Sequence, residues 1–168
     1  MARKPNSSSL KAKPREAAAD KLPWLRSYPE GVAWDARFRP TLVGNLLDQA
    51  VQTFGPRPCV YFMGKRLSFA EIGALSDRVA KGLRALGVGE GVKVGLLLPN
   101  TPTFVIFYYG VLKAGGTVVN FNPLYSLDEI EGQIRDSGAK IMVTLDLAMT
   151  FEKVAAMLQR GALDQAVV

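Results

Sequence analysis

The feature that most constrains the fold is the apolar run Val94–Leu98, which forms the centre of a predicted strand over residues 92–98. Successive side chains of a strand point to opposite faces, and this run places no polar side chain on either face. A strand that is apolar on both faces is typical of a parallel sheet covered by helices on its two sides. The chain is therefore expected to adopt an α/β fold.

Helices and strands alternate around this strand. Apolar residues at helical spacing predict helices over residues 41–54, 69–86, 102–113, 127–137 and 149–159, and short apolar runs predict strands over 117–120, 140–144 and 165–168. A hairpin is predicted from 59–63 and 66–68, with its turn at Gly64-Lys65. This order predicts a mostly parallel sheet with helices packed on it, doubly wound or close to it, with right-handed crossovers.

The predicted helix ends carry recognisable signals. Ser68 with Glu71 and Ser126 with Glu129 match the capping box, and Thr101 is expected to cap the helix that Pro102 opens. The spacing also predicts the inward faces, which are Ile72, Leu75, Val79, Leu83 and Leu86 in one helix, Leu127, Ile130 and Ile134 in another, and Phe151, Val154, Ala155 and Leu158 in the last.

The net charge of +6 is concentrated at the start of the chain. Residues 1–40 hold nine Lys+Arg against four Asp+Glu, whereas residues 41–168 hold twelve against eleven. Residues 1–20 are predicted to be a disordered basic leader, since large apolar side chains are scarce there. Residues 21–40, rich in Pro, Trp, Tyr and Phe, are predicted to be an extended arm that docks its aromatic rings on the α/β domain at 41–168.

Several kinds of chemistry are excluded or disfavoured. The chain has no His and a single cysteine, Cys59, which excludes His-based catalytic triads, the usual zinc sites and an intrachain disulfide. Gly87, Gly89 and Gly91 have neither the spacing nor the strand-before-helix context of a dinucleotide-binding loop. The acidic residues Asp128, Glu129 and Glu131 are expected to face the positive end of a helix dipole, and the segment 93–128 contains no helix long enough to span a bilayer.

Ligands of open α/β sheets bind beyond the carboxyl ends of the strands. That rule nominates Asn100-Thr101, residues 122–126 and residues 144–146. Asn122 and Tyr125 are the candidate pocket residues, because a loop stiffened by Pro123 could present them to a ligand. Shaping of the loop and filling of the core are the competing interpretations of these two side chains.

Two segments resemble core motifs of the adenylate-forming superfamily, which includes acyl-CoA synthetases, adenylation domains and luciferases. Residues 67–72, Leu-Ser-Phe-Ala-Glu-Ile, are similar to the first motif, and residues 112–123 are similar to the second. Residues 24–29, 98–100, 122–126 and 136–140 most resemble bacterial-type long-chain fatty acid–CoA ligases. The resemblance extends over about 22–168 and implies the N-terminal subdomain of that fold.

The resemblance implies a two-step reaction, in which fatty acid and ATP form an acyl-adenylate and diphosphate, and CoA then releases AMP to give a thioester. It also implies ATP, Mg²⁺ and CoA as ligands of the full-length parent enzyme, none of which is expected to bind these 168 residues alone. The phosphate loop, the nucleotide motifs and the lid with its catalytic Lys cannot be mapped onto this sequence. We therefore expect an inactive part of the ligase, truncated at its C-terminal end, with no catalytic, cofactor-binding or metal residue.

The expected partners are the remainder of the parent enzyme and a fatty acid, in the cytoplasm, with weak peripheral membrane association and no nucleic acid. Three alternatives stay open. The chain could be a stand-alone α/β binding module, another acyl- or aryl-CoA ligase or adenylating enzyme of the superfamily, or a binder of membranes or nucleic acid through its basic leader.

Overall fold

The computed structural model describes residues 22–168, which divide at Pro40 into an N-terminal unit and a larger unit, Thr41–Val168. The predicted disordered leader, residues 1–20, lies outside the described residues. In the N-terminal unit, a 3-10 helix, η1, spans Pro23–Ser27, so the predicted extended arm is helical there. Pro23 favours this start because its ring fixes φ near the helical value. The predicted docking of the aromatic residues stays a prediction.

The larger unit contains a parallel sheet, as the sequence predicted. Its strands are β3 (Lys93–Leu96), β4 (Thr117–Asn120), β5 (Ile141–Val143) and β6 (Gln165–Val167), paired in the order β4-β3-β5-β6. Val94 pairs with Val118 on one side and with Ile141 on the other. β3 therefore lies inside the sheet, where an apolar strand is expected.

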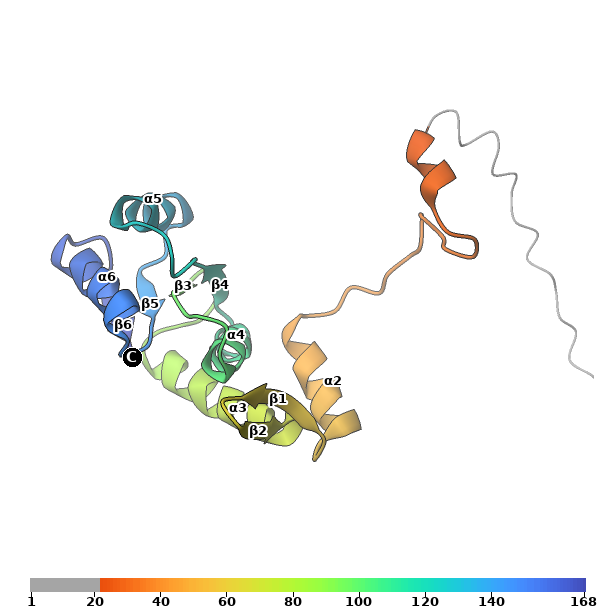
Figure 1. Ribbon diagram of the computed structural model, residues 1–168, viewed down its shortest axis with the longest axis horizontal. Coiled ribbons are helices and arrows are strands. Elements are labelled where there is room, and N and C mark those ends of the chain that lie inside the picture. The colour runs from red at the N-terminus through yellow and green to blue at the C-terminus, as the bar shows by residue number, and fades with distance from the viewer. Residues whose placement is uncertain (1–21) are drawn as a thin grey trace, which may run out of the picture. The chain divides into compact units, whose positions relative to one another are not determined.

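Helices cover both faces of this sheet (Figure 1). They are α3 (Phe69–Ala85), α4 (Pro102–Ala114), α5 (Leu127–Ser137) and α6 (Ala148–Gln159), preceded by α2 (Gly44–Phe54). Val94, Leu96 and Val143 pack with α3 and α4 in one cluster. Leu97 and Met142, from alternate positions, pack with α5 and α6 in another. Because successive side chains of each strand point to opposite faces, the sheet has one hydrophobic core on each side. The α/β prediction is confirmed.

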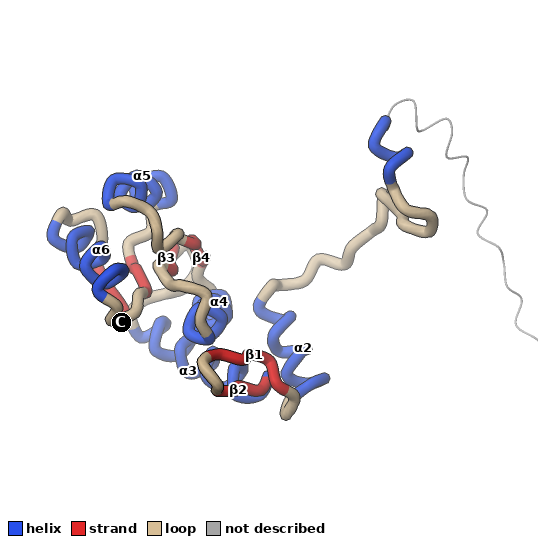
Figure 2. The backbone as a smooth tube through the Cα atoms, in the orientation of Figure 1, coloured by secondary structure: helices blue, strands red, loops and turns tan. Residues whose placement is uncertain are grey.

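The predicted hairpin forms from β1 (Pro58–Phe62) and β2 (Lys65–Ser68), which pair antiparallel (Figure 2). Phe62 pairs with Lys65, so the two-residue turn is Met63-Gly64, one position earlier than predicted. Both turn residues have positive φ, 47° and 77°. A two-residue turn of this type matches the twist of the flanking strands, which explains the shift.

The helix-end predictions are confirmed in part. Both capping boxes form, with Ser68 opening α3 and Ser126 opening α5. Thr101 occupies the position before α4, but the prediction that it caps the helix is wrong, because its side chain makes no capping hydrogen bond. Its hydroxyl is buried without a hydrogen-bond partner among the described residues.

The predicted inner faces hold for α5 and need correction elsewhere. In α3, Ile72 and Leu83 are buried, whereas Leu86 is 46% exposed beyond the helix end. In α6, Val154 is buried as predicted, but Phe151 and Leu158 are exposed. Thr150 and Met157 are buried with Val154 instead, since the positions i, i+4 and i+7 face the sheet and a residue one position later is rotated by about 100°.

Lys113 joins three helices. Its ammonium nitrogen on α4 lies 2.6 Å from Asp48 Oδ1 of α2 and 2.6 Å from Asp77 Oδ1 of α3. Burial disfavours the charged form of Lys113, but the hydrogen bonds to Asp48 and Asp77 outweigh it, so the pKa of Lys113 is raised. Arg84 also donates a hydrogen bond to the Lys113 carbonyl.

Over residues 22–168, no helix combines the length and the hydropathy needed to cross a bilayer.

The contact between α3 and α4 depends on Gly110. A Cβ atom built at Gly110 would lie 2.5 Å from Val79 Cγ1 and 2.9 Å from Val79 Cβ, both on α3. A hydrogen at this position lets the two helix backbones approach closely. Gly82, in the interior of α3, has no atom within 4 Å of such a Cβ.

Gly110→Ala is expected to lower the free energy of unfolding by about 1–3 kcal/mol, because the added methyl overpacks the α3–α4 contact. Gly82→Ala is the matched control and is expected to raise the free energy of unfolding by about 0.5–1 kcal/mol, through helix propensity. Urea unfolding of the two variants measures both effects. Equal changes in the two variants would show that the α3–α4 approach does not limit stability.

Candidate functional site

A cleft of about 550 Å³ opens at the carboxyl edge of the sheet. It lies between the loop that follows β3 and the loop that follows β4. Its lining residues are Leu98, Pro99, Asn100, Phe104, Asn120, Phe121, Asn122, Pro123, Leu124, Tyr125 and Met149. Among these described residues there is no charged side chain, so the cleft suits an uncharged, largely apolar group.

The topology explains why a cleft lies here. After β3 the chain passes to the face that holds α4, and after β4 it passes to the face that holds α5. Neighbouring strands whose connections leave on opposite faces cannot have their loops packed together, and a crevice results. Asn100 and residues 122–125, which the carboxyl-edge rule nominated, therefore line the same cleft. Thr144 and Asp146, nominated by the same rule, do not line this cleft.

Asn122 shapes the loop that forms one wall. Its side-chain Oδ1 accepts a hydrogen bond from the Leu124 amide at 3.0 Å, and its carbonyl accepts one from the Tyr125 amide at 3.1 Å. The two bonds close a tight turn in which the Asn side chain replaces a backbone acceptor. The structure supports the loop-shaping interpretation of Asn122. A ligand contact by Asn122 or by Tyr125, which is 37% exposed and lines the cleft, stays a prediction.

Lys153 of α6 fixes the same loop. Its ammonium group donates hydrogen bonds to the carbonyls of Pro123 and Tyr125, both at 2.7 Å. Bonds from a charged donor are about twice as strong as neutral ones, so this contact holds the turn against α6. Lys153, Phe104 and Met149 were not among the sequence-based candidates. They lie far from the loop in the sequence, and helical spacing does not show which tertiary partner a side chain meets.

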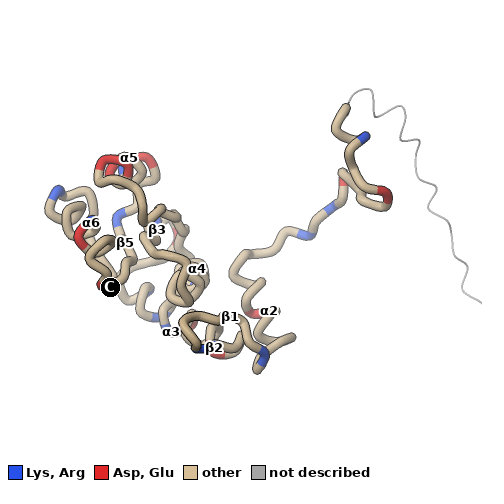
Figure 3. The backbone as a smooth tube through the Cα atoms, viewed as in Figure 1, with Lys and Arg blue, Asp and Glu red and all other residues tan. Residues whose placement is uncertain are grey.

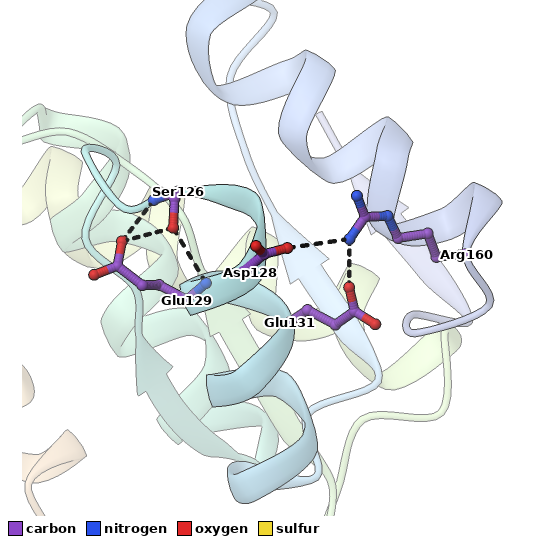
Figure 4. Close-up of polar contacts among 5 residues, drawn as sticks. All are labelled: Ser126, Asp128, Glu129, Glu131 and Arg160. Atoms are coloured by element: carbon purple, nitrogen blue, oxygen red, sulfur yellow. Dashed lines mark hydrogen bonds and ion pairs between the residues drawn. The ribbon is translucent and has the colours of Figure 1, made fainter.

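The capping box of α5 directly follows the loop (Figure 4). Glu129 accepts a hydrogen bond from the Ser126 amide at 2.8 Å, and the Ser126 hydroxyl accepts one from the Glu129 amide at 3.3 Å. The hydrogen bond from the Ser126 backbone, then the one from its side chain and the nearby Lys153 charge, lower the pKa of Glu129. The start of α5 and the end of the cleft loop are thereby fixed together.

Two other acidic residues of α5, Asp128 and Glu131, are engaged in ion pairs. Glu131 lies 2.5 Å from the Arg160 guanidinium, and Asp128 lies 3.8 Å from it (Figure 4). Across residues 22–168, no three His, Cys, Asp or Glu side chains gather closely enough to hold a metal ion. The prediction that these acids serve the helix end and the surface agrees with this geometry.

Two further sequence features have structural roles. Gly87 and Gly91 have positive φ, 88° and 80°, in the turn between α3 and β3, as expected of a helix exit rather than a phosphate loop. Cys59 is partly buried in β1, and this burial raises the pKa of its thiol. A raised pKa disfavours the reactive thiolate.

Comparison with known proteins gives a consistent result. A family model described as "AMP-binding enzyme" matches residues 47–167. The chain is 36% identical over 146 residues to a long-chain-fatty-acid–CoA ligase of Bacillus subtilis, covering 87% of this chain and 26% of that protein. It is 41% identical over 98 residues to 4-coumarate-CoA ligase 1 of Narcissus pseudonarcissus, covering 57% of this chain and 18% of that protein.

A solved structure shares the fold. The N-terminal domain of FACL13 from Mycobacterium tuberculosis superposes with a TM-score of 0.67 at 27% sequence identity, covering 76% of this chain and 34% of that one. The chain therefore spans about a quarter of the length of the Bacillus subtilis relative and a third of this structural neighbour.

Lys153→Met is expected to loosen the loop at 122–125, because two carbonyls lose a charged donor. The free energy of unfolding should fall by about 1–3 kcal/mol, and the Leu124 and Tyr125 amides should exchange about ten-fold faster. Lys81→Met, at an exposed position of α3, is the matched control and should change neither quantity. Hydrogen exchange followed by NMR makes the comparison. Unchanged exchange at Leu124 would refute the role assigned to Lys153.

Glu129→Gln is expected to destabilise the chain in a pH-dependent manner. A carboxyl whose pKa is lowered on folding contributes stability that is fully present above its unfolded pKa, about 4.5, and is lost as the pH falls through its folded pKa. The stability difference between wild type and Glu129→Gln should thus be constant near pH 6 and shrink below pH 4.5. Chemical unfolding at several pH values tests this, and a difference that grows on acidification would contradict it.

Proposed function

Because this chain belongs to the AMP-binding enzyme family, we propose that it contributes to an ATP-dependent long-chain fatty acid–CoA ligase. In the proposed reaction, a fatty acid carboxylate attacks the α-phosphorus of ATP, giving an acyl-adenylate and diphosphate. The CoA thiol then attacks the acyl carbon, giving acyl-CoA and AMP. The identity to the Bacillus subtilis ligase supports this substrate class.

The uncharged cleft is the observation that carries the proposal for these residues. Phe104, Phe121 and Met149 offer apolar surface, and each buried methylene of an acyl chain contributes about 0.8 kcal/mol. The same cleft presents neither a cation to a phosphate nor a carboxylate to Mg²⁺ within the described residues. Its proposed role is to receive the apolar part of the acyl substrate.

ATP, Mg²⁺ and CoA are proposed ligands of a full-length ligase, and none of them is expected to bind these 168 residues alone. Mg²⁺ would supply charge stabilisation at the ATP phosphates, and no described residue is assigned to it. The remainder of the ligase is the proposed partner, and the cytoplasm is the proposed location.

An acyl- or aryl-CoA ligase of another specificity is the second candidate. The 41% identity to a 4-coumarate-CoA ligase favours it over a non-enzymatic role. An aromatic acid and a fatty acid both present an apolar group that an uncharged cleft could hold. The two candidates therefore differ in the acid used, not in the reaction.

The chain alone is expected to show no ATP–diphosphate exchange with palmitate or 4-coumarate, because the residues that line the proposed cleft carry no charged group for the reacting phosphates. The Bacillus subtilis ligase serves as the positive control for palmitate. Robust exchange by the isolated chain would contradict the expected inactivity, and the acid that supports it would identify the substrate.

A chimaera tests the role of the cleft. Replacing the aligned segment of the Bacillus subtilis ligase with residues 47–167 of this chain should preserve palmitoyl-CoA formation. Met149→Lys in the chimaera should raise the KM for palmitate at least about ten-fold, because an apolar ligand in the cleft would take water from the new charge, while the KM for ATP changes little. Gln159→Lys, at an exposed position of the same helix, is the control. Equal effects of both variants, or a folded chimaera without activity, would overturn the proposed role.

A further inference from the structure

We propose that the tip of the β1–β2 hairpin docks this chain on anionic lipid bilayers. The inference goes beyond the proposed ligase activity and does not depend on it. It rests on the exposure of apolar side chains, the local charge and the backbone conformation of one continuous segment, residues 57–66.

The hairpin tip exposes three apolar side chains in succession. Tyr61 is 66% exposed, Phe62 is 38% exposed and Met63 is 87% exposed. They end β1 and begin the turn, and β2 separates this turn from the start of α3 at Phe69. Large apolar side chains at an exposed turn can enter a bilayer interface without disturbing the core.

The backbone conformation of the turn does not favour a methionine at position 63. Its φ is 47°, in the left-handed region, and it is a non-glycine residue with positive φ. Two-residue turns of this kind favour Asn, Asp or Gly at that position. The turn geometry therefore does not explain a long apolar side chain here, and within the described residues Met63 has little to pack against.

Two basic side chains, Lys65 and Arg66, directly follow the turn, and Arg57 lies at the other end of the hairpin, next to Pro58. Between Asp48 and Glu71, all of it described, the sequence carries Arg57, Lys65 and Arg66 and no acid (Figure 3). Arg66 lies over the Tyr61 ring, 5.3 Å from its centroid. Because residues 41–168 hold twelve basic and eleven acidic residues, this local excess of positive charge is a property of the hairpin and not of the domain as a whole.

The combination fits an anionic bilayer better than a nucleic acid. A basic residue near an anionic membrane surface strengthens binding about five-fold, and aromatic rings favour the interface between headgroups and acyl chains. Nucleic acids also attract cations, but the most exposed side chain of the tip, Met63, has no hydrogen-bonding group for a phosphate or base edge. Transfer of its apolar thioether side chain from water to a lipid interface is favourable in free energy.

Flotation of the full chain with phosphatidylcholine vesicles, with and without phosphatidylglycerol, tests the proposal. Binding should require phosphatidylglycerol and weaken as salt is added. Lys65→Gln with Arg66→Gln should lower the partition coefficient roughly 25-fold. Arg78→Gln with Lys81→Gln, two exposed cations of α3, removes the same charge elsewhere and should have a much smaller effect. Equal losses in both pairs would overturn the proposal and assign binding to charge in general.

A second variant reports on the tip directly and does not require charge removal. Met63→Trp places a fluorophore at the turn, and brominated lipids in the anionic vesicles should quench it beyond the quenching of the parent chain, which contains Trp24 and Trp34. Quenching equal to that of the parent chain would overturn the proposal. The proposal would also be overturned if the chain bound duplex DNA but not vesicles, and if Lys65→Gln with Arg66→Gln abolished the DNA binding.

Discussion

The two-sided burial of the central strands is the constraint on which the rest of the structure depends. β3 and β5 have helices on both faces, so their side chains must be apolar whichever way they point. Charged side chains are thereby kept out of the two clusters, and the few buried polar side chains, which include Ser76 of α3 and Thr150 of α6, carry only hydroxyl groups. The same burial fixes the register of these strands, because the side chains on each face of a strand must pack into a different hydrophobic cluster. The uncharged cleft lies at the carboxyl edge, where the strands end.

At that edge, the loop after β4 is held by contacts from three places. Asn122 closes the turn internally, Lys153 binds two of its carbonyls from α6, and the Ser126–Glu129 box fixes its exit into α5. The resulting wall is tied by hydrogen bonds at its turn and its exit, although it presents mainly apolar surface. The charged side chains Lys153 and Glu129 thus hold the wall from outside the cleft, and only uncharged side chains line the cleft itself.

Local signals in the sequence predicted the local structure well. The capping boxes at Ser68 and Ser126 need only residues three positions apart, and the apolar run at 94–98 is sufficient to predict a buried strand. The failures concern contacts between distant residues. Helical spacing suggested Phe151 and Leu158 as inner residues of α6, yet the sheet meets the stripe of Thr150, Val154 and Met157. The grip of Lys153 on the cleft loop also joins distant segments, and no periodicity reports it. The carboxyl-edge rule located the cleft because strand direction alone determines where the loops gather.

The strand order also determines when the sheet can be completed during synthesis. Val94 of β3 finds its first partner, Val118, soon after the ribosome releases β4, but its second, Ile141, belongs to β5, which emerges later. Until then the side of β3 that pairs with Ile141 has no partner strand. Such edges are templates for association with other chains. The synthesis of residues 121–140, which separate β4 from β5, is therefore the interval in which this edge of β3 is unpaired.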